Sequence, residues 1–448
     1  MTFNEITFID RRGSNSIKWD YPAKHPDPIF MWVADTDMEV PRPVMEAIRK
    51  RAEYPVFGYT MMKPDMGESV KSWCKRRFDW EVDLDWISFS TGVCPSLAIA
   101  LRALGHPGDN VVLLSPVYYP MTTIPEANGF HVLRSPLSFS KETDQWEVDW
   151  ADLEAKLALP STTQFILCNP HNPCGRKWTR SELERMGQLC VKHNVNILSD
   201  EIHWDFVLPE LDSEGKIIAS TTKHVPIASV SDEIADITVT LSAPSKTFNI
   251  PALQLSYMIV KNKKMNEALR REKDRLSAGY VQSIFAFEAL PVAYNECEGW
   301  VDAINEHYAR MAAKVRSFFS NPKYSSLVYV PKHESTFLMF IDLNGAIEHL
   351  KYVDSEGKTV YPLPLNVDRR TGEWVPEVAD PSHPNLLTDA ITQRCGVVLH
   401  EGCLFGKEGD GWVRINIAAK PETVDEALRR MGVMFDELLE EKAKREKA

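Results

Sequence analysis

The 448-residue chain has no long hydrophobic run, since no apolar stretch approaches the ~18 residues that cross a bilayer. The opening MTFNEITFIDRRG also has no apolar core preceded by positive charge, so we expect no secretory signal. Positive charge is in deficit as well: 51 Lys and Arg oppose 63 Asp and Glu, a net charge of −12. Such a chain repels a polyphosphate backbone. We therefore expect a cytoplasmic protein with neither a membrane nor a nucleic acid as partner.

Cysteine is also sparse, with eight residues scattered over the chain and none in a CxxC pair. This distribution argues against a disulfide framework and fits a reducing compartment. In CNPHNPC, Cys168, His171 and Cys174 place sulfur and nitrogen ligands at every third residue, as a zinc site does. A fourth ligand and a second ligand pair are missing, so no metal is expected.

What is present is an ordinary globular composition, 44% apolar and 25% charged, on a chain long enough for two or three cores. Between about residues 85 and 260, short apolar runs alternate with amphipathic helical stretches, which is typical of βαβ units. The expected strands begin at Trp86, Asn110, Phe165, Val195, Ile237 and Leu255. Thr179 and Glu182 form a capping box before one of the helices. The pattern predicts an α/β fold whose largely parallel sheet is covered on both faces.

After residue 265 the pattern becomes more helical, and three late strand candidates, FLMFIDL, GVVLHE and WVRINIA, predict a second, smaller α+β domain. Apolar residues at helical spacing from Val424 to Leu439 predict a C-terminal helix packed by one face. Residues 351–385 are rich in Pro, Asp and Gly, so we interpret them as an inserted hairpin or loop.

Candidate functional residues follow the predicted strands, because ligands of open α/β sheets bind at the carboxyl ends of the strands. Gly92, Val93 and Cys94 form a turn into a helix N-terminus, which suits a phosphate, although such turns are common. Tyr118 follows the next strand, where an aromatic ring suits stacking on a planar ligand, although a half-buried rim tyrosine is the more common arrangement.

The residues at the ends of the later strands carry amide, carboxylate and amine groups that can bind a ligand or react with it. Asn172 lies in a proline-rich turn, which is either structural or presents its amide at a fixed place. Asp200 ends a buried strand and needs a cationic or hydrogen-bonding partner. Lys246 follows another strand among the small hydroxyl residues Ser242 and Ser245. An imine-forming lysine, a carboxylate for a ring nitrogen, a phosphate turn and a stacking aromatic together meet the needs of pyridoxal 5'-phosphate.

With these residues in place, the chain resembles the class I/II aminotransferase-type pyridoxal phosphate enzymes of fold type I, and most of all their cystathionine β-lyase (carbon-sulfur lyase) branch. The matching segments are MWVADTDMEVP, FGYT, STGVCPSL, SPVYYPM, NPHNPCGRKWT, SDEIHWDF, SKTFNIPAL and GWVRINIA. The resemblance implies a large domain with a mostly parallel seven-stranded sheet and a smaller α+β domain. We expect residues 1–50 and 311–448 in the small domain and residues 51–310 in the large one.

The resemblance also implies roles for single residues. Lys246 is implied to be the Schiff-base lysine and the base that removes the substrate α-proton. Asp200 is implied to pair with the ring nitrogen, Asn172 and His203 to contact the O3′ side of the ring, and Tyr118 to stack on it.

The phosphate is implied to bind the backbone of Gly92, Val93 and Cys94 and the hydroxyls of Ser242 and Ser245. Tyr59 is implied to reach the phosphate from the other subunit of a homodimer, and Arg414 to bind the substrate α-carboxylate. Gln254 stands where many aminotransferases have a phosphate-binding arginine. We therefore expect a lyase that cleaves an S-substituted cysteine to thiol, pyruvate and ammonia. The alternative is an aminotransferase acting on an amino acid.

Overall fold

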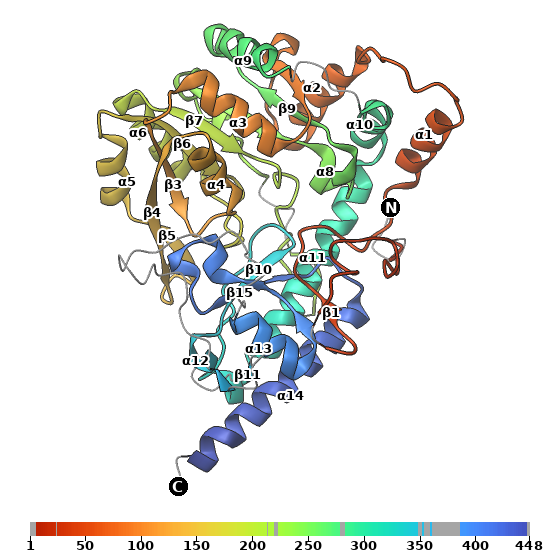
Figure 1. Ribbon diagram of the computed structural model, residues 1–448, viewed down its shortest axis with the longest axis vertical. Helices are drawn as coiled ribbons and strands as arrows, with labels where there is room; N and C mark the ends of the chain where they lie inside the picture. The colour runs from red at the N-terminus through yellow and green to blue at the C-terminus, as the bar shows by residue number, and fades with distance from the viewer. Residues whose placement is uncertain are drawn as a thin grey trace.

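An eight-stranded mixed sheet forms the core of the upper part of the molecule in Figure 1, a computed structural model. The structure describes residues 6–23, 25–212, 214–218, 223–277, 283–347, 352–353, 359–360 and 386–445. The strands are β2 (Ile87–Ser90), β3 (Asn110–Ser115), β4 (His131–Ser140), β5 (Gln145–Val148), β6 (Thr162–Cys168), β7 (Asn196–Asp200), β8 (Thr238–Ser242) and β9 (Ser256–Ile259). Their order is β2-β9-β8-β7-β6-β3-β4-β5, and the pairs from β8 to β4 are parallel.

The predicted fold class is confirmed, with one strand more than expected. Strand β4 continues past Pro136 and pairs antiparallel with β5, with Leu137 opposite Val148. The sequence pattern missed both strands, because HVLRSPLSFS contains a proline and no regular run of apolar residues. In the parallel region, Cys168 of β6 lies opposite Asp200 of β7, so the carboxyl ends of neighbouring strands are level.

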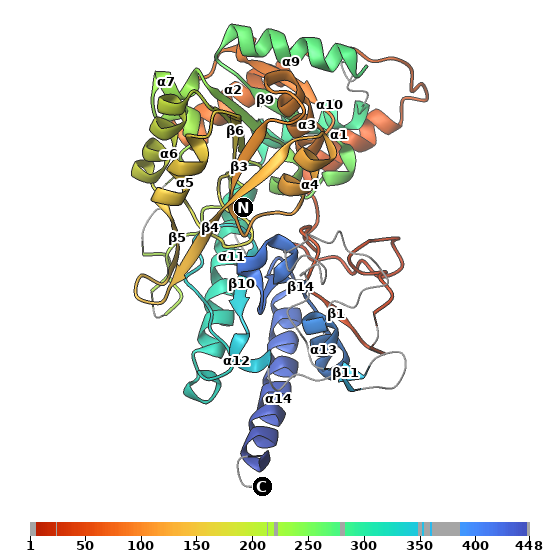
Figure 2. The same cartoon turned by 60° about the vertical axis from the view of Figure 1, so that its left-hand side comes forward.

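Helices cover both faces of this sheet, as expected for a buried parallel sheet. Val111 and Leu113 of β3 pack in one apolar cluster with Leu97 and other residues of α3 (Val93–Leu104). Val112 and Leu114 point to the opposite face and pack in a second cluster with residues of α5 (Trp150–Leu157) and α6 (Arg180–His193). Figure 2 shows these helices on either side of the strands.

The capping box at the start of α6 is confirmed. The Thr179 hydroxyl accepts from the Glu182 N–H, and the Thr179 N–H donates to the Glu182 carboxylate. The other helices of the upper part are α1 (Arg42–Ala52), α2 (Asp65–Phe78), α4 (Pro120–Ala127), α7 (Asp232–Ala235), α8 (Pro244–Thr247), α9 (Lys263–Arg275) and α10 (Ile284–Glu296).

A second, smaller sheet lies in the lower part of Figure 1, reached by the long helix α11 (Glu298–Phe319). Its antiparallel order is β10 (Leu338–Asp342), β15 (Trp412–Asn416) and β14 (His400–Glu401). The N-terminal segment joins this part of the fold, because β1 (Ile29–Phe30) pairs with β13 (Val397–Val398). The exact domain boundaries at residues 50 and 310 stay predictions.

The C-terminal helix α14 (Pro421–Arg445) buries the expected apolar face, including Leu428, Met431 and Phe435. Helices α12 (Asn344–Ile347) and α13 (Leu386–Cys395) complete the lower part. Most of the predicted insertion 351–385 lies outside the described residues, apart from the paired β11 (Tyr352–Val353) and β12 (Thr359–Val360).

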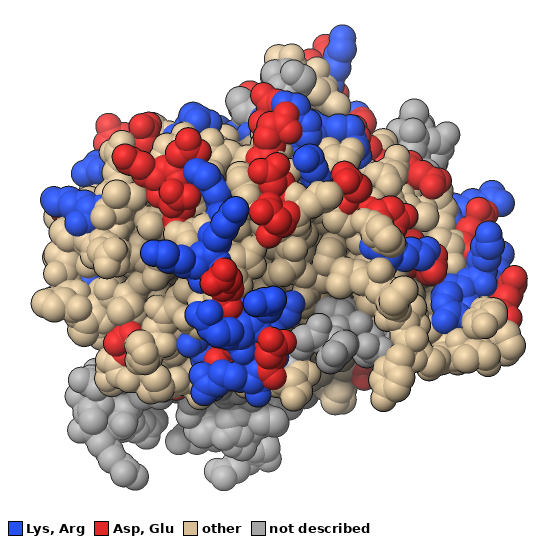
Figure 3. Space-filling model, turned by 90° about the horizontal axis from the view of Figure 1, so that it is seen from above, with Lys and Arg blue, Asp and Glu red and all other residues tan. Residues whose placement is uncertain are grey.

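The surface carries both signs of charge, and Figure 3 shows acidic and basic side chains interspersed on the face seen from above. All eight cysteines are free thiols. Within the described residues, no helix combines the length and the apolar character that crossing a membrane requires.

Candidate active site

Lys246 lies on the short helix α8, directly after the carboxyl end of β8. Its Nζ donates to the carbonyl oxygen of Ala34 over 2.7 Å. Burial lowers the pKa of the amine, the Asp35 carboxylate opposes this shift, and the Arg414 guanidinium adds to it. The neighbouring Thr247 hydroxyl donates to the buried Asp205 carboxylate over 2.8 Å, which anchors the turn. The lysine is thus a positioned amine whose pKa lies below its ordinary value.

Asp200 lies at the carboxyl end of β7, is buried, and forms no ion pair with any of the described residues. Its Oδ1 accepts from the Ile202 N–H over 3.1 Å, and no ion pair within 4 Å reaches it in the described part of the chain. Burial raises the pKa of this carboxyl group to about 7. An ionised carboxylate at this depth is costly unless a cation joins it. Asp200 is therefore suited to hold a protonated ring nitrogen.

His203 follows Asp200 by three residues and is also buried. Its Nδ1 is buried and has no hydrogen-bond partner among the residues that the structure describes, and burial holds the pKa of the imidazole well below its usual value. A buried polar atom without a partner is uncommon in a native fold unless a ligand satisfies it. His203 lies near Lys246 and Arg414, whose positive charges also lower its pKa, so the unpaired nitrogen belongs to the same site.

Arg414 on β15 is the cation of the site and is almost completely buried. Its Nη1 donates to Asn172 Oδ1 over 3.0 Å, and its Nη2 contacts His400 Nδ1 at 2.8 Å and the Trp32 carbonyl at 3.3 Å. The Nε atom has no partner, and no carboxylate pairs with the guanidinium in the described residues. Burial lowers its pKa to about 10, which leaves it charged. A substrate carboxylate is the missing partner that this arrangement calls for.

The glycine turn opens helix α3, with Gly92 in the N-cap position and an extended backbone. Cys94, in the first turn of α3, interacts electrostatically with both Asp200 and Lys246, and burial raises the pKa of its thiol to about 11. The helix N-terminus therefore lies beside the amine and the carboxylate, where its N–H groups suit an anion.

Tyr118 and the two serines complete the expected set. The Tyr118 N–H donates to the Asn172 carbonyl over 3.0 Å, and burial raises the pKa of its phenol. Ser245 is half-buried next to Lys246. Ser242 is buried, and its hydroxyl donates to the Glu201 carbonyl over 3.4 Å, so that proton is already engaged.

Tyr59 is the one expected residue that a single chain does not bring into this group. Its side chain is fully exposed, at 101%, in the segment between α1 and α2, at the right of Figure 1. Phe57 and Met61 in the same segment are 62% and 89% exposed. A role for Tyr59 at the phosphate of another subunit stays a prediction.

Sequence reasoning missed the contribution of segment 32–35. The carbonyl of Trp32 accepts from Arg414 and that of Ala34 from Lys246, so one short segment contacts both the guanidinium and the amine of the site. Asp35 forms a 2.8 Å ion pair with Arg11 and influences the pKa of Lys246. Backbone carbonyls leave no side-chain signature, although MWVADTDMEVP did stand out as a matching segment.

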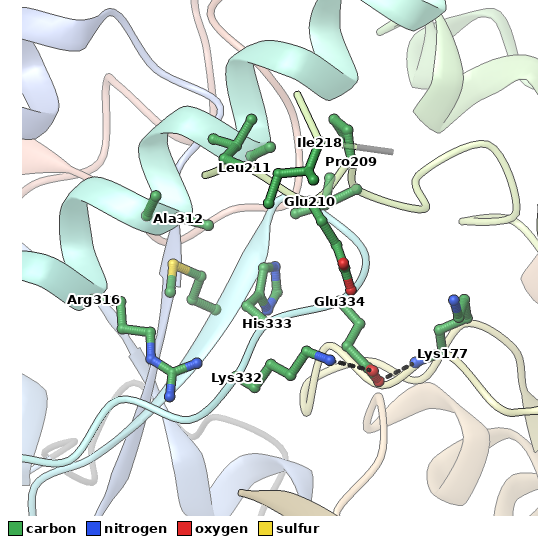
Figure 4. Close-up of a pocket in the computed structure, with 14 residues that line it drawn as sticks. Lys177, Pro209, Glu210, Leu211, Ile218, Ala312, Arg316, Lys332, His333 and Glu334 are labelled. Carbon is green, nitrogen blue, oxygen red and sulfur yellow. Dashed lines mark hydrogen bonds and ion pairs between the residues drawn. The ribbon is translucent and has the colours of Figure 1, made fainter. Parts of the chain in front are cut away.

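A separate pocket of about 380 Å³ lies between α11 and the segments around residues 208–211 and 332–334 (Figure 4). Lys332 and Glu334 line it and form an ion pair at 3.6 Å, and Glu334 also accepts from the Lys177 N–H. None of the predicted site residues lines this pocket, so the strand-end cluster remains the candidate active site.

Comparison with known proteins gives the family. The model for aminotransferase class I and II matches residues 33–431. The chain belongs to this family. It is 33% identical to cystathionine beta-lyase PatB of Bacillus subtilis over 94% of this chain and 97% of the relative. It is 28% identical to protein MalY of Escherichia coli over 92% of this chain and 94% of that protein.

Among solved structures, cystalysin of Treponema denticola superposes with a TM-score of 0.82 at 26% identity, covering 98% of this chain and all of that one. The cystalysin structure contains pyridoxal 5'-phosphate. The residues of the present site fit this group, since within the described residues Asp200 has no ion-pair partner and His203 Nδ1 has no hydrogen-bond partner, while Cys94 in the first turn of α3 interacts with Lys246.

Proposed function

We propose that the chain is a pyridoxal phosphate-dependent carbon-sulfur β-lyase that acts on an S-substituted cysteine such as cystathionine. The observation that carries the proposal is the cluster of Lys246, Asp200 and Arg414. Asp200 and Lys246 stand at the carboxyl ends of the neighbouring parallel strands β7 and β8, and the segment 32–34 contacts both Lys246 and Arg414. The lyase activity is supported by the 33% identical relative named cystathionine beta-lyase.

When bound, pyridoxal phosphate supplies an electron sink for the electron pair left at the substrate Cα. Lys246 would hold its aldehyde carbon, and Asp200 would keep the ring nitrogen protonated. Asn172 and His203 would contact the O3′ side, and Tyr118 would cover one face of the ring. The backbone of Gly92, Val93 and Cys94 binds the phosphate together with Ser245, and with Ser242 once its hydroxyl turns from the Glu201 carbonyl.

Arg414 binds the substrate carboxylate and orients the amino acid for attack at Cα. Lys246 removes the α-proton, a step that needs the neutral amine that burial favours. The Cβ–S bond then breaks and the electron pair leaves with sulfur, which becomes the thiol on protonation. Overall, one substrate and one water give one thiol, one pyruvate and one ammonia, without net oxidation or reduction.

The active unit in this proposal is a homodimer. The exposed Phe57, Tyr59 and Met61 between α1 and α2 fit a surface that a second copy covers, with Tyr59 reaching the partner's phosphate site. We also propose that the protein works in the cytoplasm, where its eight free cysteines stay reduced. The division into a large domain and a small domain at about residues 50 and 310 belongs to the same proposal.

The proposal is tested by incubating the purified holoprotein with cystathionine and no keto acid. A β-lyase releases thiol and pyruvate over many turnovers. An aminotransferase uses the same residues but stops after one equivalent, because it then needs a keto acid to regain the aldehyde form of its cofactor.

A further inference from the structure

Four aromatic side chains form a chain of ring contacts that includes His400, the residue that contacts Arg414. We call them the aromatic rim: Tyr21, Trp32, Tyr119 and His400. Their rings form a chain of contacts. The ring centroids are 4.9 Å apart between Tyr21 and Trp32, 6.0 Å between Trp32 and His400, and 6.4 Å between Tyr119 and His400. These separations are typical of tilted and edge-to-face aromatic pairs.

Hydrogen bonds fix the rim to the guanidinium. His400 Nδ1 accepts from Arg414 Nη2 over 2.8 Å, and the Trp32 carbonyl accepts from the same nitrogen over 3.3 Å. Two residues after Trp32, the carbonyl oxygen of Ala34 accepts a hydrogen bond from Lys246 Nζ. The segment that carries the Trp32 ring therefore also contacts the amine of Lys246. An amino acid held between Arg414 and Lys246 would thus lie beside the segment that carries the Trp32 ring.

The rim is partly open, in contrast to the buried cation behind it. Tyr21 and Tyr119 are 48% and 39% exposed, whereas Arg414 is 1% exposed. The rim is also uncharged. Among the described residues, the charged group that faces His400 is the guanidinium of Arg414. Burial and this positive charge lower the pKa of His400, whose Nδ1 accepts a hydrogen bond from Arg414 Nη2.

We propose that the aromatic rim is the subsite for the substituent on the substrate sulfur, and that it selects planar aromatic substituents over charged aliphatic ones. This inference rests on the proposed lyase function and names the substrate class of the same site. An aryl or benzyl group gains ring contacts on the rim. The tail of cystathionine carries an ammonium and a carboxylate, and no rim residue offers a charge to either.

The test compares kcat/KM for S-benzyl-L-cysteine, cystathionine and S-methyl-L-cysteine, read by thiol release from the holoprotein. The wild type is expected to prefer the benzyl substrate. Trp32→Ala and Tyr119→Ala should each reduce the benzyl-to-methyl ratio about threefold to tenfold, the range for one lost aromatic pair. Trp32→Phe and Tyr119→Phe are the matched controls and should keep most of the preference. The Trp32 substitutions leave the backbone carbonyl in place, so its bond to Arg414 is retained.

A binding measurement separates the two proposals. Dissociation constants for the same three compounds are taken from the change in cofactor absorbance, which does not require turnover. Suppose that no compound releases thiol, that the benzyl compound still binds tightest, and that the Ala variants lose this preference. The proposed lyase function is then wrong, and the proposed subsite is supported. If the wild type shows no aromatic preference in either measurement, or the Ala variants keep it unchanged, the subsite is overturned.

Discussion

Arg414 Nη1 donates to Asn172 Oδ1 over 3.0 Å, a bond that joins β15 of the lower part of the molecule to the turn after β6 in the upper part. The amide oxygen orients the guanidinium without neutralising it. The positive charge thus remains available for a carboxylate, while its position relative to the strand ends of the large sheet is fixed.

Replacement of the guanidinium tests this role directly. Arg414→Lys retains a positive charge but loses the planar fork that a carboxylate binds. We expect kcat/KM to fall about 10-fold to 100-fold, mostly through a higher KM, which matches the loss of one charge-assisted hydrogen bond. Steady-state kinetics on one substrate measures the effect. Arg429→Lys, on the exposed face of α14, is the control and should leave both constants unchanged.

Lys246→Ala should remove the amine that holds the cofactor. We expect the variant to lose the visible absorbance of the lysine-bound cofactor and to release no thiol above background. Absorbance spectra and a thiol assay measure these two effects. Lys264→Ala, at an exposed position on α9, is the matched control. Persistence of either property in Lys246→Ala would remove this residue from its proposed role.

Asp200 makes the stability of the cofactor-free protein depend on pH. Its pKa is raised from 3.8 to about 7 by burial, so the folded state binds the proton more tightly than the unfolded state between these values. The free energy of unfolding therefore decreases as pH rises through this window and is level above it. Asp200→Asn removes this loss.

In thermal unfolding of the cofactor-free protein, we expect the stability advantage of Asp200→Asn over the wild type to grow by about 2–3 kcal/mol from pH 5 to pH 8. With pyridoxal phosphate present at pH 8 the order should change, because the amide cannot neutralise a protonated ring nitrogen and the variant binds the cofactor more weakly. If the stability advantage of Asp200→Asn is equal at both pH values, burial does not raise the pKa of Asp200 in the folded protein, and the prediction is wrong.

The contribution of Tyr59 from a second subunit is tested by complementation. Tyr59→Ala and Lys246→Ala are each expected to have low activity as homodimers. When the two variants are mixed under conditions that exchange subunits, one site of each mixed dimer should contain an intact lysine from one chain and an intact Tyr59 from the other. Activity should then rise above that of either variant alone. No rise, with exchange verified, would place Tyr59 outside the partner's site.

The sequence predicted those parts of the site that depend on strand ends. Asp200 ends the apolar strand β7 and Lys246 follows the end of β8 by four residues, so the parallel pairing of β7 with β8 makes their proximity a consequence of topology. Arg414 needed the family resemblance, because it lies far away along the chain on the smaller sheet.

Other features depended on contacts that no local pattern records. The Ala34 and Trp32 carbonyls act through the backbone, and His400 joins the site only because β14 pairs with β15, which places it opposite Arg414. Ser242 has the expected residue type at the expected place, yet its hydroxyl is directed to Glu201. Hydroxyl orientation follows from the packed surroundings, so residue type alone could not predict it.

The central claim is that the site breaks the Cβ–S bond of a cysteine derivative. The most direct measurement follows thiol, pyruvate and ammonia from an S-substituted cysteine and the purified holoprotein without any keto acid. The account predicts equal amounts of the three products, many times the amount of enzyme. Formation of no thiol, with one equivalent of keto acid per active site and conversion of the cofactor to its amine form, would contradict it.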